Sequence, residues 1–184
     1  MGIVPYQIPP RRNARRQAST ELLSEWLALY HRDARVFHNL RLGPAPAVPR
    51  GFVPSPEIER MLKRRNRYAD AVVVTPAELL VVEAKMDPSS AAIGQVLDYA
   101  DLVTSSPELA PYASLQIVPV VLWPADDPIA HRRAAALGVR VEIYTPSWYE
   151  EWLREGYWRM QSTRQSRRAI ARGAGTPSPD GSPA

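Results

Sequence analysis

The stretch of the chain that decides the fold, residues 70–85, reads Asp70-Ala-Val-Val-Val-Thr-Pro-Ala-Glu-Leu-Leu-Val-Val-Glu-Ala-Lys85. Two apolar, valine-rich runs flank the break Thr75-Pro76-Ala77-Glu78, and this pattern is typical of two β-strands joined in a hairpin. Because the proline fixes a negative φ, a four-residue loop fits this break better than a tight two-residue turn. The sequence therefore predicts a hairpin centred on residues 75–78.

The register of this hairpin brings two acidic side chains together. Pairing Val74 with Leu79 places Asp70 directly opposite Glu83, and because side chains alternate between faces, Lys85 points the same way as Glu83. Directly opposed residues have Cβ atoms about 4.5–5.5 Å apart, and like charges at that spacing repel each other. A single lysine balances only one of the two carboxylates, so the arrangement favours a hard divalent cation such as Mg²⁺. An ordinary ion pair at the end of a hairpin is the alternative.

Length and composition narrow the class of protein. The chain has 184 residues, of which 45% are hydrophobic and 23% charged, which indicates a globular protein with a sizeable core. It has no cysteine, which excludes disulfides, thiolate metal sites and cysteine nucleophiles. No apolar run approaches the length of about 18 residues that spans a bilayer, and the N-terminus does not resemble a signal peptide. We therefore expect no membrane partner and a cytoplasmic location, in a bacterium or in the host cell of a phage.

The remaining segments alternate between helix and strand patterns. The expected order is a helix to residue 30, a strand 35–42, a loop 43–56, a short helix from 56, the hairpin, a helix 90–103, a strand 115–123, a helix 128–138, a strand 139–144 and a last helix after 147. This order predicts a mixed α/β layer fold. We expect one domain over 13–160, an irregular arm over 1–12, and a basic and then Pro/Gly/Ser-rich disordered tail over 161–184.

A basic cluster directly precedes the hairpin. Five cationic side chains fall within eight residues: Arg60, Lys63, Arg64, Arg65 and Arg67. Contacts from lysine and arginine to phosphates give affinity that does not depend on base sequence and that falls with salt. The cluster therefore indicates nucleic-acid binding close to Asp70, with a solvated helix face as the alternative.

The order helix–strand–strand–strand–helix–strand, with Asp70 followed by Glu83-Ala84-Lys85, resembles the PD-(D/E)XK nuclease superfamily. The run Gln95-Val-Leu-Asp-Tyr99 is similar to the Gln-x-x-x-Tyr motif of RecB-type and lambda-exonuclease-type members. The resemblance covers roughly residues 15–125 and implies a restriction-endonuclease-like α-β-β-β-α-β core, with a mixed sheet flanked by helices and an extra C-terminal α-β-α segment. Ala69 stands where the family usually has the proline of its name.

The resemblance implies a metal site. Asp70, Glu83 and the backbone carbonyl of Ala84 would hold one or two Mg²⁺ or Mn²⁺ ions. Members of the family usually complete this site with an acidic residue from the first helix. Glu25 is the preferred candidate because it lies closer to the apolar stripe of that helix, and Glu21 is the alternative.

The resemblance also implies catalytic roles and an activity. Lys85 would orient or deprotonate the attacking water or neutralise the transition state, Gln95 would position its neighbours, and Tyr99 would contact the backbone or DNA. The expected activity is metal-dependent hydrolysis of DNA phosphodiester bonds by a structure-specific or non-specific endonuclease, in recombination, repair or phage genome processing. A nuclease-like fold retained for DNA binding or assembly without cleavage is the alternative. Whether the chain forms a homo-oligomer stays open.

Overall fold

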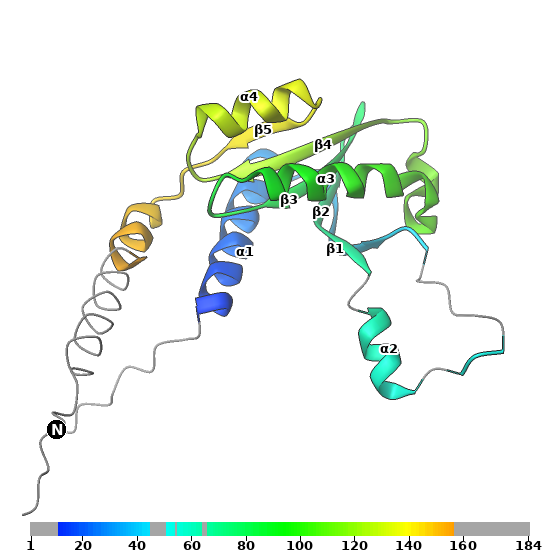
Figure 1. Cartoon of the computed structure of the whole chain (residues 1–184). Helices are drawn as coiled ribbons and strands as arrows, with labels where there is room; N and C mark the ends of the chain where they lie inside the picture. The colour runs from blue at the N-terminus through cyan, green and yellow to red at the C-terminus, as the bar shows by residue number, and fades with distance from the viewer. Residues whose placement is uncertain (1–10, 45–50, 54, 64–65, 157–184) are drawn as a thin grey trace, which may run out of the picture. The chain divides into compact units, whose positions relative to one another are not determined.

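A computed structural model describes residues 11–44, 51–53, 55–63 and 66–156 (Figure 1). The chain divides into two compact units, Met1–Pro146 and Ser147–Ala184. The arm predicted over 1–12 lies mostly outside the described residues, and α1 begins at Arg11. The tail predicted over 161–184 lies entirely outside them, so these domain boundaries stay predictions.

The described elements of the first unit follow the predicted order. They are α1 (Arg11–Tyr30), β1 (Arg35–Leu42), α2 (Pro56–Lys63), β2 (Arg67–Val74), β3 (Glu78–Ala84), α3 (Ser90–Leu102), β4 (Gln116–Trp123), α4 (Pro128–Ala136) and β5 (Arg140–Ile143). Two short 3₁₀ helices, Val103–Ser105 and Pro107–Tyr112, connect α3 to β4 and were not predicted. In the second unit, residues 149–156 are helical, which agrees with the helix expected after residue 147.

The strands form one five-stranded mixed sheet in the order β1-β2-β3-β4-β5. The pairs β1–β2 and β2–β3 are antiparallel, whereas the pairs β3–β4 and β4–β5 are parallel. Parallel neighbours need a crossover connection, and α3 and α4 supply the two crossovers. The predicted mixed α/β class is confirmed.

Helices cover both faces of this sheet (Figure 1). The main apolar core packs Leu79 and Val81 of β3 against buried side chains of α3 and α4. Leu80 and Val82 alternate to the opposite face and are also buried, and α1 contacts β3 on that side. Burial on both faces explains why the hairpin strands are apolar at nearly every position.

Local signals in the sequence set the ends of several elements. Ser89 caps α3 by accepting a hydrogen bond from the Ala92 amide, and Asp127 caps α4 by accepting from two amides of its first turn. The hairpin loop is closed by Thr75, whose amide donates to the Glu78 carbonyl at 2.9 Å and whose hydroxyl accepts from the Glu78 amide at 2.9 Å. The break lies where it was predicted, but it is one residue shorter, because Glu78 bonds to Thr75 and already belongs to β3.

The predicted hairpin register is also confirmed where the two strands pair. Val74 lies opposite Leu79, and three further pairs follow, ending at Ala71 and Val82. The pairing stops there, so Asp70 and Glu83 occupy the next positions without forming a ladder pair. Within the described residues, no helix is both long enough and apolar enough to cross a bilayer.

Candidate functional site

Asp70 lies at the point where β2 separates from β3. The segment of β2 before Asp70 pairs only with β1, through Ala69 and Leu40 and the two pairs that follow. We call this point, where β2 and β3 separate, the fork. The Asp70 carboxylate bridges the two strands there, because its Oδ2 accepts a hydrogen bond of 3.0 Å from the Ala84 amide at the end of β3. A side chain thus takes the place of the backbone pair that the register predicts. This contact fixes Asp70 beside the C-terminal end of β3.

Glu83 is a carboxylate buried at the same fork. Only 2% of the residue is exposed, and its Oε2 has no hydrogen-bond partner among the described residues. Burial and, after it, the neighbouring Asp70 carboxylate raise the pKa of Glu83 to about 7, although the Lys85 ammonium opposes both effects. A buried oxygen without a partner is costly, so this position suits a site that receives a cation.

Lys85 places an ammonium group at the rim of the site. Its backbone amide donates to the Leu122 carbonyl at 3.0 Å, which extends the pairing of β3 and β4 by one residue. Its Nζ donates to Oε1 of Glu83. Because 37% of the Lys85 side chain remains exposed, the amine can contact Glu83 and a solute at the surface.

Tyr99 of α3 lies within electrostatic reach of both acids. Burial raises the pKa of its phenol to about 12, and the negative charges of Glu83 and Asp70 contribute in the same direction. The residue is only 7% exposed and belongs to the main apolar core. Gln95, one turn earlier on α3, is exposed. The two members of the predicted motif thus occupy different environments, one inside the core and one on the surface.

The two acidic candidates on α1 have other surroundings. Glu25 accepts a hydrogen bond of 2.8 Å from the hydroxyl of Tyr144, which follows β5. Glu21 is exposed. Within the described ranges, no group of three or more Asp, Glu, His or Cys side chains is arranged to hold a metal ion. A role for Glu25 or Glu21 in metal binding stays a prediction.

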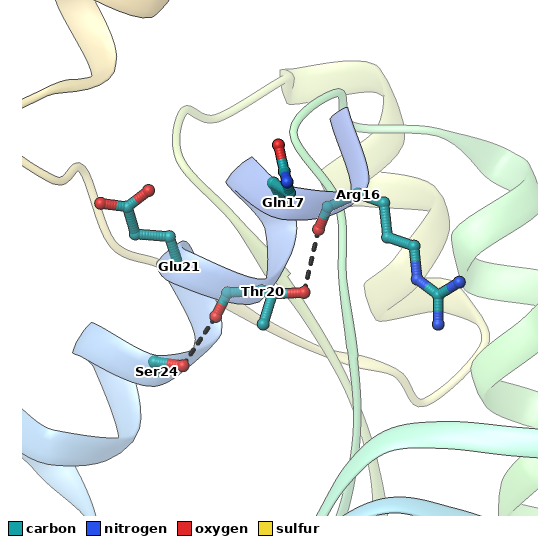
Figure 2. Close-up of a pocket in the computed structure, with 5 residues that line it drawn as sticks. All are labelled: Arg16, Gln17, Thr20, Glu21 and Ser24. Carbon is teal, nitrogen blue, oxygen red and sulfur yellow. Dashed lines mark hydrogen bonds between the residues drawn. The ribbon is translucent and has the colours of Figure 1, made fainter. Parts of the chain in front are cut away.

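A pocket lies along α1, and the paired acids are not among its described lining residues (Figure 2). Its described lining comes from one helix and consists of Arg16, Gln17, Thr20, Glu21 and Ser24. Figure 2 shows the hydroxyl groups of Thr20 and Ser24 bonded to carbonyls one turn earlier on the helix. These bonds occupy the hydroxyls within the helix, and the pocket contains none of Asp70, Glu83 and Lys85.

The structure describes part of the basic cluster. Arg60 is exposed on α2, where it pairs with Glu57 at 2.9 Å. Arg67 is exposed at the start of β2, and its positive charge acts on Tyr99 against the effect of burial, so it lies within electrostatic reach of that phenol. The Lys63 side chain, together with Arg64 and Arg65, falls outside the described residues. Among the described residues of the cluster, Arg67 is linked electrostatically to Tyr99, and the phosphate contacts stay predictions.

Two residues of this region were not anticipated from the sequence. Tyr144 donates a hydrogen bond to Glu25, which lies 119 positions earlier in the chain, and no local sequence pattern predicts such a contact. Asn39 of β1 has a φ of 48° and occupies the register position opposite Asp70. An asparagine inside a strand is a usable signal in this case, because asparagine adopts the left-handed region more readily than most residues.

Comparison with known proteins adds no relatives. No protein-family model matches the chain, and a search of curated proteins finds no match. The resemblance to the PD-(D/E)XK nucleases therefore stays a prediction from the sequence motifs and their order in the chain.

The donor atoms at the fork fit a hard cation. Asp70 and Glu83 supply carboxylate oxygens, one of which is buried and without a partner among the described residues. Divalent ions such as Mg²⁺ take oxygen ligands and usually bind through one or two carboxylates together with waters. A cation at this position would also offset the repulsion that raises the pKa of Glu83.

Proposed function

We propose that this chain is a metal-dependent DNA nuclease of the PD-(D/E)XK superfamily, with a restriction-endonuclease-like α-β-β-β-α-β core. The observation that carries the proposal is the buried Glu83 oxygen without a described partner, next to Asp70 where β2 leaves β3. The element order supports it, since one helix, three antiparallel strands, a helix and a parallel strand follow one another, with α2 inserted between β1 and β2.

Asp70, Glu83 and the backbone carbonyl of Ala84 would hold Mg²⁺ or Mn²⁺. When bound, such an ion supplies Lewis-acid stabilisation of the phosphate and lowers the pKa of a water ligand. Asp70 is held for this role by the Ala84 amide, and Glu83 by its burial in the fork. The protein therefore presents two oriented carboxylates before substrate arrives, which reduces the reorganisation that binding requires.

Lys85 provides the positive charge of the protein beside the scissile phosphate. The Lys85 side chain is partly exposed, and its amine donates a hydrogen bond to Glu83. The same amine can therefore also donate a hydrogen bond to an attacking water or to a phosphate oxygen. Gln95 and Tyr99 of α3 would position these groups, Tyr99 from within the core and Gln95 from the surface.

The basic residues around α2 and the start of β2 would hold the DNA backbone. Arg60 and Arg67 are exposed, and Arg67 stands three residues before Asp70 on the same strand. Contacts of this kind carry little base specificity, which favours a structure-specific or non-specific endonuclease. We include in the same proposal that the protein cleaves DNA in the cytoplasm, during recombination, repair or phage genome processing.

A second candidate function is DNA binding or assembly without cleavage. It is favoured by one observation, the hydrogen bond that engages Glu25 with Tyr144. Among the described residues, no third acid joins Asp70 and Glu83 in a group arranged to hold a metal ion. A protein that retains the fold and the basic surface would then bind DNA without cutting it.

A cleavage assay separates the two functions. Supercoiled plasmid and labelled single-stranded, duplex, flap and four-way DNA are incubated with Mg²⁺, with Mn²⁺ or with EDTA. We expect the wild type to cut with either ion and not in EDTA, and Lys85→Ala to cut at least about 100-fold more slowly. Arg132→Ala on α4 is the matched surface control and should cut at the wild-type rate. Binding without cutting by the wild type under every condition would establish the second function.

A further inference from the structure

One position on β1 departs from regular strand geometry. Asn39 has a φ of 48° and is the sole residue other than glycine with a positive φ in the part of the chain that the structure describes. The strand pairs on either side of it are formed, His38 with Ala71 and Leu40 with Ala69. The pair between them, Asn39 with Asp70, is missing. The irregularity therefore falls at the register position of a proposed metal ligand.

The side chains of both strands change face at this point. On β1, Phe37 and Leu40 both pack against the main apolar core, and on β2, Ala69 and Val72 both belong to it. The two residues of each pair lie three positions apart in the chain. Strict alternation would place residues three apart on opposite faces of the sheet. The two strands therefore bend together at Asn39 and Asp70.

The bend coincides with the fork that holds the acids. The ladder between β2 and β3 ends at Ala71, one residue from the missing pair, and beyond it β2 follows β1. Only where the strands separate can the Asp70 carboxylate reach the Ala84 amide, with which it makes its hydrogen bond of 3.0 Å. An unbent β2 would continue its backbone pairing to β3 and carry the Asp70 side chain to one face of the sheet.

The backbone of Asn39, rather than its side chain, accounts for the bend. The residue is exposed, so no packing contact of the side chain requires an asparagine there. A left-handed backbone is unfavourable for most residues with a side chain, and least so for glycine, asparagine and aspartate. Asparagine therefore permits a bend that a β-branched residue, the common choice in strands, would oppose.

We propose that Asn39 is a positioning residue, whose left-handed backbone bends β1 and β2 at Asp70 and directs the Asp70 carboxylate to the Ala84 amide and the cation site. The part of this inference that concerns the cation rests on the proposed function. The part that concerns the Asp70–Ala84 hydrogen bond stands on geometry alone. The two parts have separate readouts.

Three variants test the proposal. Asn39→Val disfavours the left-handed backbone, Asn39→Gly permits it, and His38→Val adds the same side chain at the neighbouring exposed position of the strand. The first readout is hydrogen exchange of the Ala84 amide, measured by NMR on metal-free protein. The second is Mn²⁺ affinity, measured from the EPR signal of the free ion. Asn39→Ala replaces the valine variant if the latter does not fold, because alanine also disfavours a positive φ.

We expect Asn39→Val to lose protection of the Ala84 amide and to bind Mn²⁺ about tenfold more weakly, as is typical when support of a metal ligand is removed. Asn39→Gly and His38→Val should match the wild type in both readouts. Unchanged protection and affinity in Asn39→Val would overturn the proposal. Loss in Asn39→Gly would overturn it as well, because glycine preserves the backbone.

The same experiment separates this proposal from the proposed function. If the wild type binds no Mn²⁺, the metal site is wrong and so is the purpose given to the bend, whatever the Ala84 amide shows. If the wild type binds Mn²⁺ and the valine variant binds it equally well, the metal site stands and the role of Asn39 in cation binding is overturned. Protection of the Ala84 amide then decides the role of Asn39 in the Asp70–Ala84 hydrogen bond.

Discussion

The substitution Glu83→Gln gives the most direct test of the electrostatics at the fork. Burial and the Asp70 charge raise the pKa of Glu83 from 4.5 to about 7. Because the folded-state pKa is raised, Glu83 favours folding below pH 4.5, and this contribution is lost as the pH rises from 4.5 to 7. At about 1.4 kcal/mol for each pKa unit, the ionised group lowers the stability of the metal-free fold by about 3 kcal/mol above pH 7.

Glutamine keeps the shape of the side chain and removes its ionisation. The opposing effect of the Lys85 ammonium is already contained in the raised pKa, so it is not subtracted again. We therefore expect metal-free Glu83→Gln to be about 3 kcal/mol more stable than the wild type at pH 8 and close to it at pH 4.5. Urea unfolding at both pH values, with EDTA present, measures this difference.

Metal addition provides the matched control. An ion that binds only the folded state at 100 times its dissociation constant stabilises that state by about 2.7 kcal/mol. Mg²⁺ should therefore stabilise the wild type at pH 8 and leave Glu83→Gln nearly unchanged. The reasoning is refuted if, in EDTA, the difference in unfolding free energy between variant and wild type is the same at pH 4.5 and pH 8.

Three further predictions concern the scaffold and the DNA surface. Gly43→Ala should lower the free energy of unfolding by more than about 1 kcal/mol in urea titrations, because the φ of Gly43 is +71° and the new Cβ would lie 2.9 Å from a side chain of α3. Gly94→Ala on α3 has open space around the new Cβ, so it should raise the free energy of unfolding by about 1 kcal/mol. Asp127→Ala should lower the thermal unfolding midpoint through a loss of about 1 kcal/mol, since it removes both capping bonds of α4, and an unchanged midpoint would contradict this role. Arg67→Ala should weaken DNA binding in fluorescence anisotropy and reduce the slope of log affinity against log salt by about 1, while an equal loss in Arg132→Ala would show that the effect is not local.

Much of the fold follows from patterns that are local in the chain. The strand predicted over residues 35–42 coincides with β1, the helix predicted over 90–103 agrees with α3 to within one residue, and the break at Thr75-Pro76-Ala77-Glu78 lies where the chain turns from β2 to β3. These features depend on residues a few positions apart, whose propensities and hydrogen bonds act without the rest of the molecule. The register from Val74 and Leu79 could be counted for the same reason.

The candidate site could be predicted only in part. Counting along the hairpin brings Asp70 near Glu83, and in the structure the Asp70 carboxylate bonds to the amide of Ala84, the residue that follows Glu83. The counting does not reveal that the ladder stops one pair earlier and that Asp70 bonds to the Ala84 amide instead. That outcome depends on a bend shared with β1, which lies about thirty residues away in the chain.

The sequence by itself determined which residues form the hairpin, the capped helices and the pair of acids, because each depends on spacing along the chain. Only the tertiary structure decided that Glu83 is buried with an oxygen lacking a described partner, that Tyr144 engages Glu25, and that Asn39 bends the sheet opposite Asp70. Burial and contacts between distant segments arise from packing the sheet between its helices. No local sequence pattern predicts this burial or these contacts, because residues far apart in the chain become neighbours only when the helices pack on the sheet.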